Sequence, residues 1–109
     1  MDMTQARAGA ETGMKRAAAH ANAVRAGWTD DAYAYLTGWA RGMRGRSGRN
    51  AFMAEDVRAS AERFGFSPPD NRAWGPVFRR AVSAGLIRKA GYAPSKTGHC
   101  RPMPLWEAI

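Results

Sequence analysis

The residues best suited to chemistry in this chain are a group of cations in its last third. Between Asn71 and Leu105 there are seven Lys or Arg residues and no Asp or Glu. Guanidinium and ammonium groups bind phosphate oxygens. An Asn or Arg that reaches a base edge can also form bidentate hydrogen bonds with adenine or guanine. This segment therefore predicts contact with a polyanion, and nucleic acid is the first candidate.

The charge of the whole chain points the same way. Its 109 residues carry a formal net charge of +8. A surplus of that size in a single small domain favours DNA, RNA or an acidic membrane surface as partner. The alternative is a basic surface that only keeps the protein in solution, and composition does not identify the polymer.

Other kinds of chemistry find little support in the sequence. The only adjacent His and Cys are His99 and Cys100, no second Cys exists, and metal-ligand spacing is absent. We therefore expect no catalytic residues, no metal and no cofactor. A lone cysteine and the absence of a long apolar run or a signal peptide predict a cytoplasmic protein that does not enter a membrane.

The elements that position the cations begin with an N-terminal extension over residues 1–27. It is rich in alanine, and we expect a frayed start followed by a helix over about 13–26. The main domain is expected over residues 28–109. Its first helix should start after Thr29 as N-cap, with two aspartates in its first turn. One apolar stripe marks its inner face: Ala32, Tyr35, Leu36, Trp39, Ala40 and Met43.

A basic, glycine-containing loop is predicted over 41–50, followed by a short strand over 51–53. This loop is either a tether for nucleic acid or a linker. The next helix is predicted over 54–64, with Val57, Ala61 and Phe64 facing the core and Gly65 as its C-cap.

The third helix of the domain follows the turn at 67–70, with Asp70 as its N-cap. Its expected buried face consists of Trp74, Val77, Phe78, Ala81 and Val82. Pro76 lacks an N–H, so the helix is either kinked there or starts there. Strands are predicted over 86–92 and 102–106, joined by a basic loop. Pro102 and Pro104 should confine the last strand to a sheet edge.

The expected fold class is mainly α with a small β-hairpin, or α+β. The order helix, strand, helix, turn, helix, strand, strand and the junction Ala-Gly-Leu-Ile over 84–87 resemble a winged helix-turn-helix domain. The resemblance covers about residues 29–106, with an extra N-terminal helix before it. The chain is also similar to small phage or prophage proteins with a Trp-Gly-Pro motif at the position of residues 74–76.

The resemblance implies roles for the cations. Asn71 and Arg72, at the start of the third helix, would contact base edges in the major groove. Arg79 and Arg80 would touch phosphate. The hairpin would hold the nucleic acid backbone through its own basic side chains, namely Arg88, Lys89, Lys96, His99 and Arg101. Each of these residues could instead belong to an ordinary solvated surface.

The four tryptophans also allow two roles. Trp28, Trp39, Trp74 and Trp106 are either platforms on which bases stack or core residues. The apolar stripes around Trp39 and Trp74 favour the core. Trp106, near the C-terminus, could cap the core or contact another subunit.

Two hypotheses of different kinds follow. In the first, this is a small phage or mobile-element protein that binds double-stranded DNA, as a regulator or a replication or recombination accessory. It could act as a homodimer joined by the N-terminal helix or the C-terminal strand. In the second, it is an interaction module that inhibits a host protein complex, for example an anti-defence protein similar to anti-CRISPR proteins.

Overall fold

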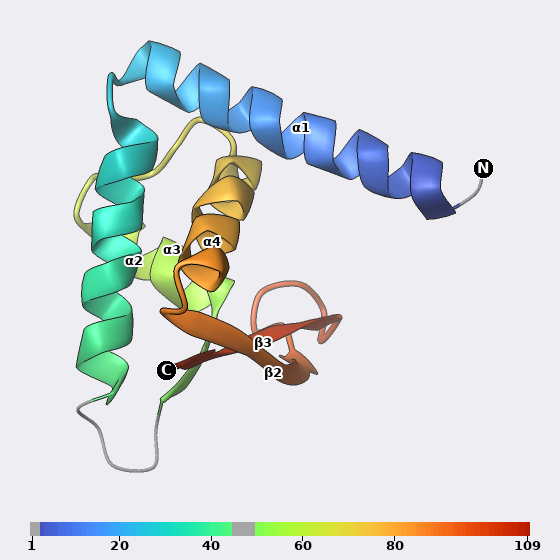
Figure 1. The fold of residues 1–109 in the computed structure, drawn as a ribbon, viewed down its shortest axis with the longest axis vertical. Helices are drawn as coiled ribbons and strands as arrows, with labels where there is room; N and C mark the ends of the chain where they lie inside the picture. The colour runs from blue at the N-terminus through green and yellow to red at the C-terminus, as the bar shows by residue number, and fades with distance from the viewer. Residues whose placement is uncertain (1–2, 45–49) are drawn as a thin grey trace.

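The structure is a computed structural model that describes residues 3–44 and 50–109 (Figure 1). It is mainly helical with a small antiparallel sheet, so the α+β fold class is confirmed. The helices are α1 (Met3–Val24), α2 (Trp28–Arg44), α3 (Ala54–Arg63) and α4 (Trp74–Ser83), and a 3₁₀ turn at Asn71–Ala73 precedes α4. The strands are β1 (Ala51–Met53), β2 (Ile87–Pro94) and β3 (Pro102–Ala108).

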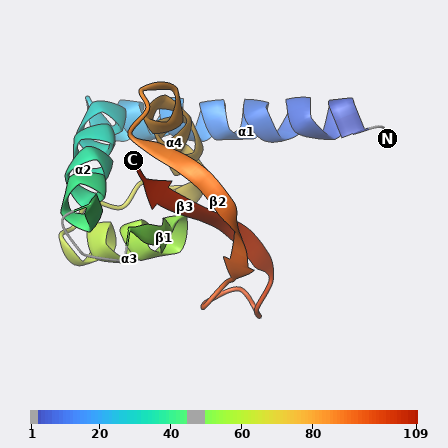
Figure 2. The ribbon, with the colours of Figure 1, turned by 60° about the horizontal axis from the view of Figure 1, so that its bottom comes forward.

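Helix α1 is longer than the sequence pattern predicts. It starts at Met3 instead of about residue 13 and ends at Val24 instead of 26. Alanine has the highest helix propensity, so a proline-free, alanine-rich segment can be helical even where it has no apolar face to bury. Over residues 9–24 of α1, three alanines are buried in the same core as α2 and α4: Ala17, Ala18 and Ala21. The N-terminal half extends beyond the other elements in two views (Figures 1 and 2).

Helix α2 starts one residue before its predicted N-cap. Trp28 is already helical, and Thr29 instead hydrogen-bonds to Asn22 of α1, its N–H donating to Oδ1 at 3.0 Å. The predicted stripe is confirmed: Ala32, Leu36 and Ala40 are buried, and the other three members pack against the core. The helix continues to Arg44, so the first residues of the predicted 41–50 loop are helical. Residues 45–49 lie outside the described part of the chain.

The end of α3 corrects one core prediction. Val57 and Ala61 are fully buried, but Phe64 is 77% exposed. Gly65, with φ of +69°, reverses the chain after the helix and carries Phe66 inward in its place. The Phe66 ring stacks on Trp28 with 6.0 Å between ring centroids, and its carbonyl oxygen accepts a hydrogen bond from the Trp28 indole.

The start of α4 is a 3₁₀ turn rather than regular helix. Asp70 caps this turn as predicted, because its carboxylate accepts the N–H of Arg72 at 2.9 Å. The α-helix proper starts at Trp74, so Pro76 lies in the first turn, where its missing N–H costs no hydrogen bond. Trp74, Val77, Phe78 and Ala81 are buried. Val82 is 42% exposed, against prediction, because it borders an open groove.

The sheet order is β1-β3-β2, so β3 is central rather than an edge strand. β1 pairs only with Leu105–Glu107, at the end of β3 that follows the prolines. Pro102 and Pro104 pair with β2 alone, and their missing N–H groups face no third strand. Both strands of the hairpin are also two residues longer at their C-terminal ends than predicted, and the connecting loop is correspondingly short.

Candidate nucleic-acid interface

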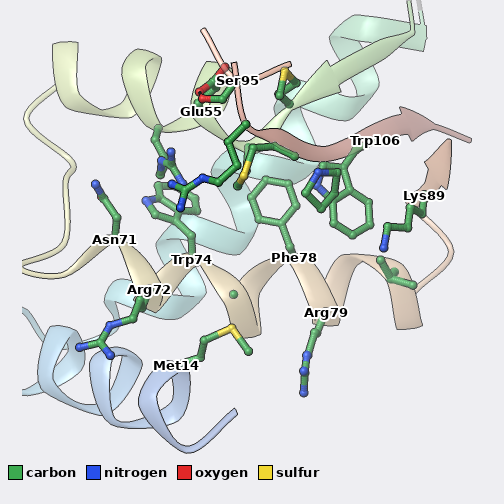
Figure 3. A pocket seen from close by; sticks show the side chains of 18 of the residues that line it. Met14, Glu55, Asn71, Arg72, Trp74, Phe78, Arg79, Lys89, Ser95 and Trp106 are labelled. Atoms are coloured by element: carbon green, nitrogen blue, oxygen red, sulfur yellow. Dashed lines mark hydrogen bonds between the residues drawn. The ribbon is translucent and has the colours of Figure 1, made fainter. Parts of the chain in front are cut away.

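An open groove of about 820 Å³ runs along α4 (Figure 3). Its second wall is formed by the start of α3 and by the β2–β3 hairpin, and Met14 of α1 also lines it. Pockets of roughly 300–1,000 Å³ are typical of ligand sites. The segments that form this groove come from four separate parts of the chain.

The groove has an apolar and partly aromatic lining. Trp74, Phe78 and Trp106 follow one another along it, and the last two rings are 5.6 Å apart between centroids. Trp74 and Phe78 are largely buried, whereas Trp106 is partly exposed. The indole N–H of Trp74 is buried without an acceptor among the described residues. Methionines complete much of the remaining lining: Met14, Met53 and Met103.

Cations surround this apolar lining. Within residues 3–44 and 50–109, five Lys or Arg residues line the groove: Arg58, Arg72, Arg79, Lys89 and Arg101. Lys89 is directly opposite Trp106 in the pairing of β2 with β3, and its ammonium group lies over the ring of Tyr92, 4.6 Å from the centroid. The arrangement combines a flat apolar surface with positive charge at its rim.

Among the described residues, Glu55 is the single carboxylate that lines the groove, and the hairpin loop engages both of its oxygens. It accepts hydrogen bonds from the Lys96 backbone N–H at 2.7 Å, the Ser95 hydroxyl at 2.8 Å and the Thr97 hydroxyl at 2.9 Å. These donors, the Lys96 amide first and the Ser95 hydroxyl next, lower the pKa of Glu55 from 4.5 to about 2. Glu55 is therefore ionised at neutral pH and fastens the loop to the start of α3.

The loop itself is compact. The buried Ser95 hydroxyl accepts the N–H of Gly98 at 2.8 Å, and the Ser95 N–H donates to the Arg101 carbonyl at 2.9 Å. His99 and Cys100 both adopt positive φ, 55° and 60°, which is uncommon for residues other than glycine. This turn and the Glu55 contacts hold Arg101 at the rim of the groove.

Helix α1 covers one stripe of α4. Gly75 faces Met14 so closely that a Cβ at position 75 would lie 2.2 Å from the Met14 sulfur. Arg79 forms an ion pair with Glu11 at 2.9 Å. Arg72 lies beside Gly13, and in Figure 3 Met14, Arg72 and Arg79 are all on the α1 side of α4. This stripe is the outward face that the sequence assigned to nucleic acid.

Most of the other predicted contact residues are also paired within the chain. Arg72 binds Asp70 at 2.7 Å, Arg80 binds Asp30 at 2.9 Å, and the Arg80 guanidinium lies over the ring of Tyr33. Arg88 pairs with Glu107 of the neighbouring strand. The Asp70 carboxylate raises the pKa of Arg72, mainly by hydrogen bonding. Exposed ion pairs of this kind contribute little to stability. Exchanging the carboxylate for another anion would therefore cost little free energy.

The hairpin cations differ in their partners. Lys96 forms an ion pair with Asp56 at 2.9 Å, which raises the pKa of Lys96. Lys89 donates to the Tyr92 hydroxyl. Within the described residues, Lys89 and Arg101 have no carboxylate partner, and Asn71 is exposed at the end of the groove.

The structure thus brings five of the eight predicted contact residues to one groove: Asn71, Arg72, Arg79, Lys89 and Arg101. Arg80, Arg88 and Lys96 lie outside it. Sequence reasoning missed Arg58 and the role of Met14. Arg58 is three positions after Glu55 and thus on the same face of α3, but only the position of the hairpin loop shows that this face borders a groove.

Residues 3–44 and 50–109 contain no cluster of three or more His, Cys, Asp or Glu side chains that could hold a metal ion. No helix in these ranges combines the length and the apolar character needed to cross a bilayer.

Comparison with known protein families, with characterised proteins and with solved structures finds no match to this chain. The assignment of a function therefore depends on the geometry and charge of the groove.

Proposed function

We propose that this chain is a small winged-helix protein that binds DNA, with the groove between α4 and the hairpin as its contact surface. The order of elements supports the fold proposal. A helix, a strand, two helices joined by a short turn and a hairpin follow one another, and the sheet order is β1-β3-β2. In this arrangement α4 corresponds to the recognition helix and the hairpin to the wing.

The observation that carries the binding proposal is the imbalance of charge at the groove. In the part of the chain that the structure describes, five cationic side chains line the groove, and its one carboxylate, Glu55, accepts hydrogen bonds from the hairpin loop at both oxygens. A phosphate backbone would meet this positive rim without facing a free carboxylate of the lining. The net charge of +8 adds a long-range attraction toward any polyanion.

The proposal relocates the expected contacts. The sequence placed base contacts at Asn71 and Arg72 and phosphate contacts at Arg79 and Arg80. In the proposed interface, the main phosphate contacts are made by Arg58, Lys89 and Arg101. These three side chains form no ion pair with a carboxylate among the described residues, so they are available to phosphate. Arg72 and Arg79 join them only by exchanging their carboxylate partners.

Fluorescence anisotropy with labelled DNA tests this interface. The wild-type chain is titrated into duplex and single-stranded oligonucleotides between 50 and 200 mM salt, a range over which phosphate contacts weaken steeply. The double variant Arg58→Ala, Arg101→Ala should reduce the salt slope by about 2, since each lost phosphate contact removes about 1.

The matched control removes two cations elsewhere. Arg41 and Arg63 are exposed and do not line the groove. The variant Arg41→Ala, Arg63→Ala has the same net charge as the test variant and should keep the wild-type slope. Equal weakening by both variants would show a diffuse charge effect instead of this interface. Absence of binding to any oligonucleotide at low salt would contradict DNA binding and leave the protein-interaction hypothesis.

A further inference from the structure

Helix α1 crosses α4 near the N-terminal end of α4 (Figure 1), which is the end of a recognition helix that reaches the base edges. Met14 packs on Gly75, and Glu11 binds Arg79. A helix that reads duplex DNA must place a side-chain-bearing face in the major groove, which is about 12 Å wide. The width of an α-helix with its side chains is about 10–12 Å, so the N-terminal end of α4 cannot enter the groove together with α1, which crosses it there.

The groove has the two properties of a surface for single strands. Such surfaces combine a positively charged path for the backbone with aromatic side chains on which bases stack. Here Trp106 supplies a partly exposed ring, with Lys89 opposite it across the strand pair. Arg58 and Arg101 carry positive charge along the other part of the same wall.

We propose that the groove binds a single strand of nucleic acid, with one unstacked base against Trp106 and adjacent phosphates on Lys89, Arg101 and Arg58. This inference rests on the proposed DNA-binding function and specifies its substrate. In a duplex the bases are stacked on one another and offer no free face to Trp106. A duplex would therefore meet only the cationic rim and leave the apolar lining in contact with water.

Three oligonucleotide probes of equal length separate the contributions: a thymine single strand, the corresponding duplex and an abasic single strand. The abasic strand keeps the phosphates and lacks the bases. Stacking of one base changes affinity by roughly 5- to 150-fold, as alanine substitutions of aromatic platforms show. We expect the thymine strand to bind at least about 5-fold more tightly than the abasic strand or the duplex.

Tryptophan fluorescence provides a second readout that needs no destabilising variant. The thymine strand should quench the emission of the wild-type chain, and the abasic strand should not. Trp106→Phe should lose most of this quenching and retain part of the affinity, since phenylalanine still offers a ring. Trp39→Phe is the control: Trp39 packs against Phe52 and does not line the groove.

The outcomes distinguish the two proposals. If the thymine strand, the abasic strand and the duplex bind equally, the interface holds phosphate and the single-strand inference is wrong. If the duplex binds more tightly than the thymine strand, the inference is also wrong, while DNA binding stands. If none of the three binds, both proposals fail.

Discussion

Met14 of α1 packs directly on Gly75 of α4, at a point where α4 has no side chain. A Cβ at position 75 would come within 2.2 Å of the Met14 sulfur and 3.4 Å of its Cβ. Together with the 2.9 Å ion pair between Glu11 and Arg79, this contact fixes one turn of α1 across the start of α4 (Figure 1). The N-terminal extension is thus part of the surface around the candidate site.

Gly75→Ala should therefore destabilise the chain although alanine favours helix. Met14 would have to move, and overpacking of this kind typically costs about 1–3 kcal/mol. Gly38 in the middle of α2 is the matched control, because nothing lies within 4 Å of a Cβ built there. Gly38→Ala should stabilise the chain by roughly 0.5–1 kcal/mol. Urea unfolding measures both, and equal stabilisation by the two changes would show that α1 does not pack on Gly75.

Two phenylalanines close together in the chain should differ sharply in their contribution to stability. Phe66 packs on Trp28 and is near Trp74, so Phe66→Ala should lower the free energy of unfolding by about 2–3 kcal/mol. Phe64 is 77% exposed, and Phe64→Ala should change it by less than about 0.5 kcal/mol. Thermal or urea unfolding measures the free energy of unfolding of the two variants and of the wild-type chain. A larger loss of stability for Phe64→Ala would contradict the placement of Phe66 against the core and of Phe64 on the surface.

The attachment of the hairpin loop should depend on pH through Glu55. Its pKa is about 2 in the folded chain against an ordinary 4.5, so the folded state binds fewer protons than the unfolded state between these values. The stabilisation is complete above pH 4.5 and is lost as the pH falls toward 2. The amide proton of Lys96, which donates to Glu55, should report this in NMR spectra with a midpoint near pH 2.

A local readout is needed because other carboxylates contribute to acid stability. Hydrogen bonds from Arg72 lower the pKa of Asp70, and Arg88 and Asn50 lower that of Glu107. Circular dichroism over the same pH range distinguishes loop release from unfolding of the whole chain. Glu55→Gln should abolish the titration of the Lys96 amide, and Glu62→Gln should leave it unchanged. A midpoint near 4.5 in the wild-type chain would mean that the carboxylate does not hold the loop.

Local patterns predicted much of this fold correctly. The apolar stripe of α2, the strand at 51–53, the cap at Asp70 and the hairpin after Gly85 were all expected, and all are present. Each depends on side chains within a few positions of one another, where helical periodicity, capping and turn chemistry operate. The errors at Thr29 and Phe64 arose where a contact from another element outweighed the local preference.

The candidate site was predicted only in part. Positive charge between residues 71 and 105 indicated a cationic surface, but the groove also needs Arg58, Met14 and the engaged carboxylate of Glu55. Glu55 and Ser95 are 40 residues apart in the chain, and no short-range pattern joins them. The same holds for the ion pairs that engage Arg79 and Arg80.

The sequence by itself therefore determined the type and order of the elements and the excess of positive charge, because these follow from residue identity and local spacing. Only the tertiary structure decided that β3 is the central strand, that α1 packs on the start of α4, and that a groove opens between α4 and the hairpin. Those features depend on which apolar surfaces pack together across the whole chain. Packing of that kind is a property of the folded core, in which segments distant in sequence exclude water from each other.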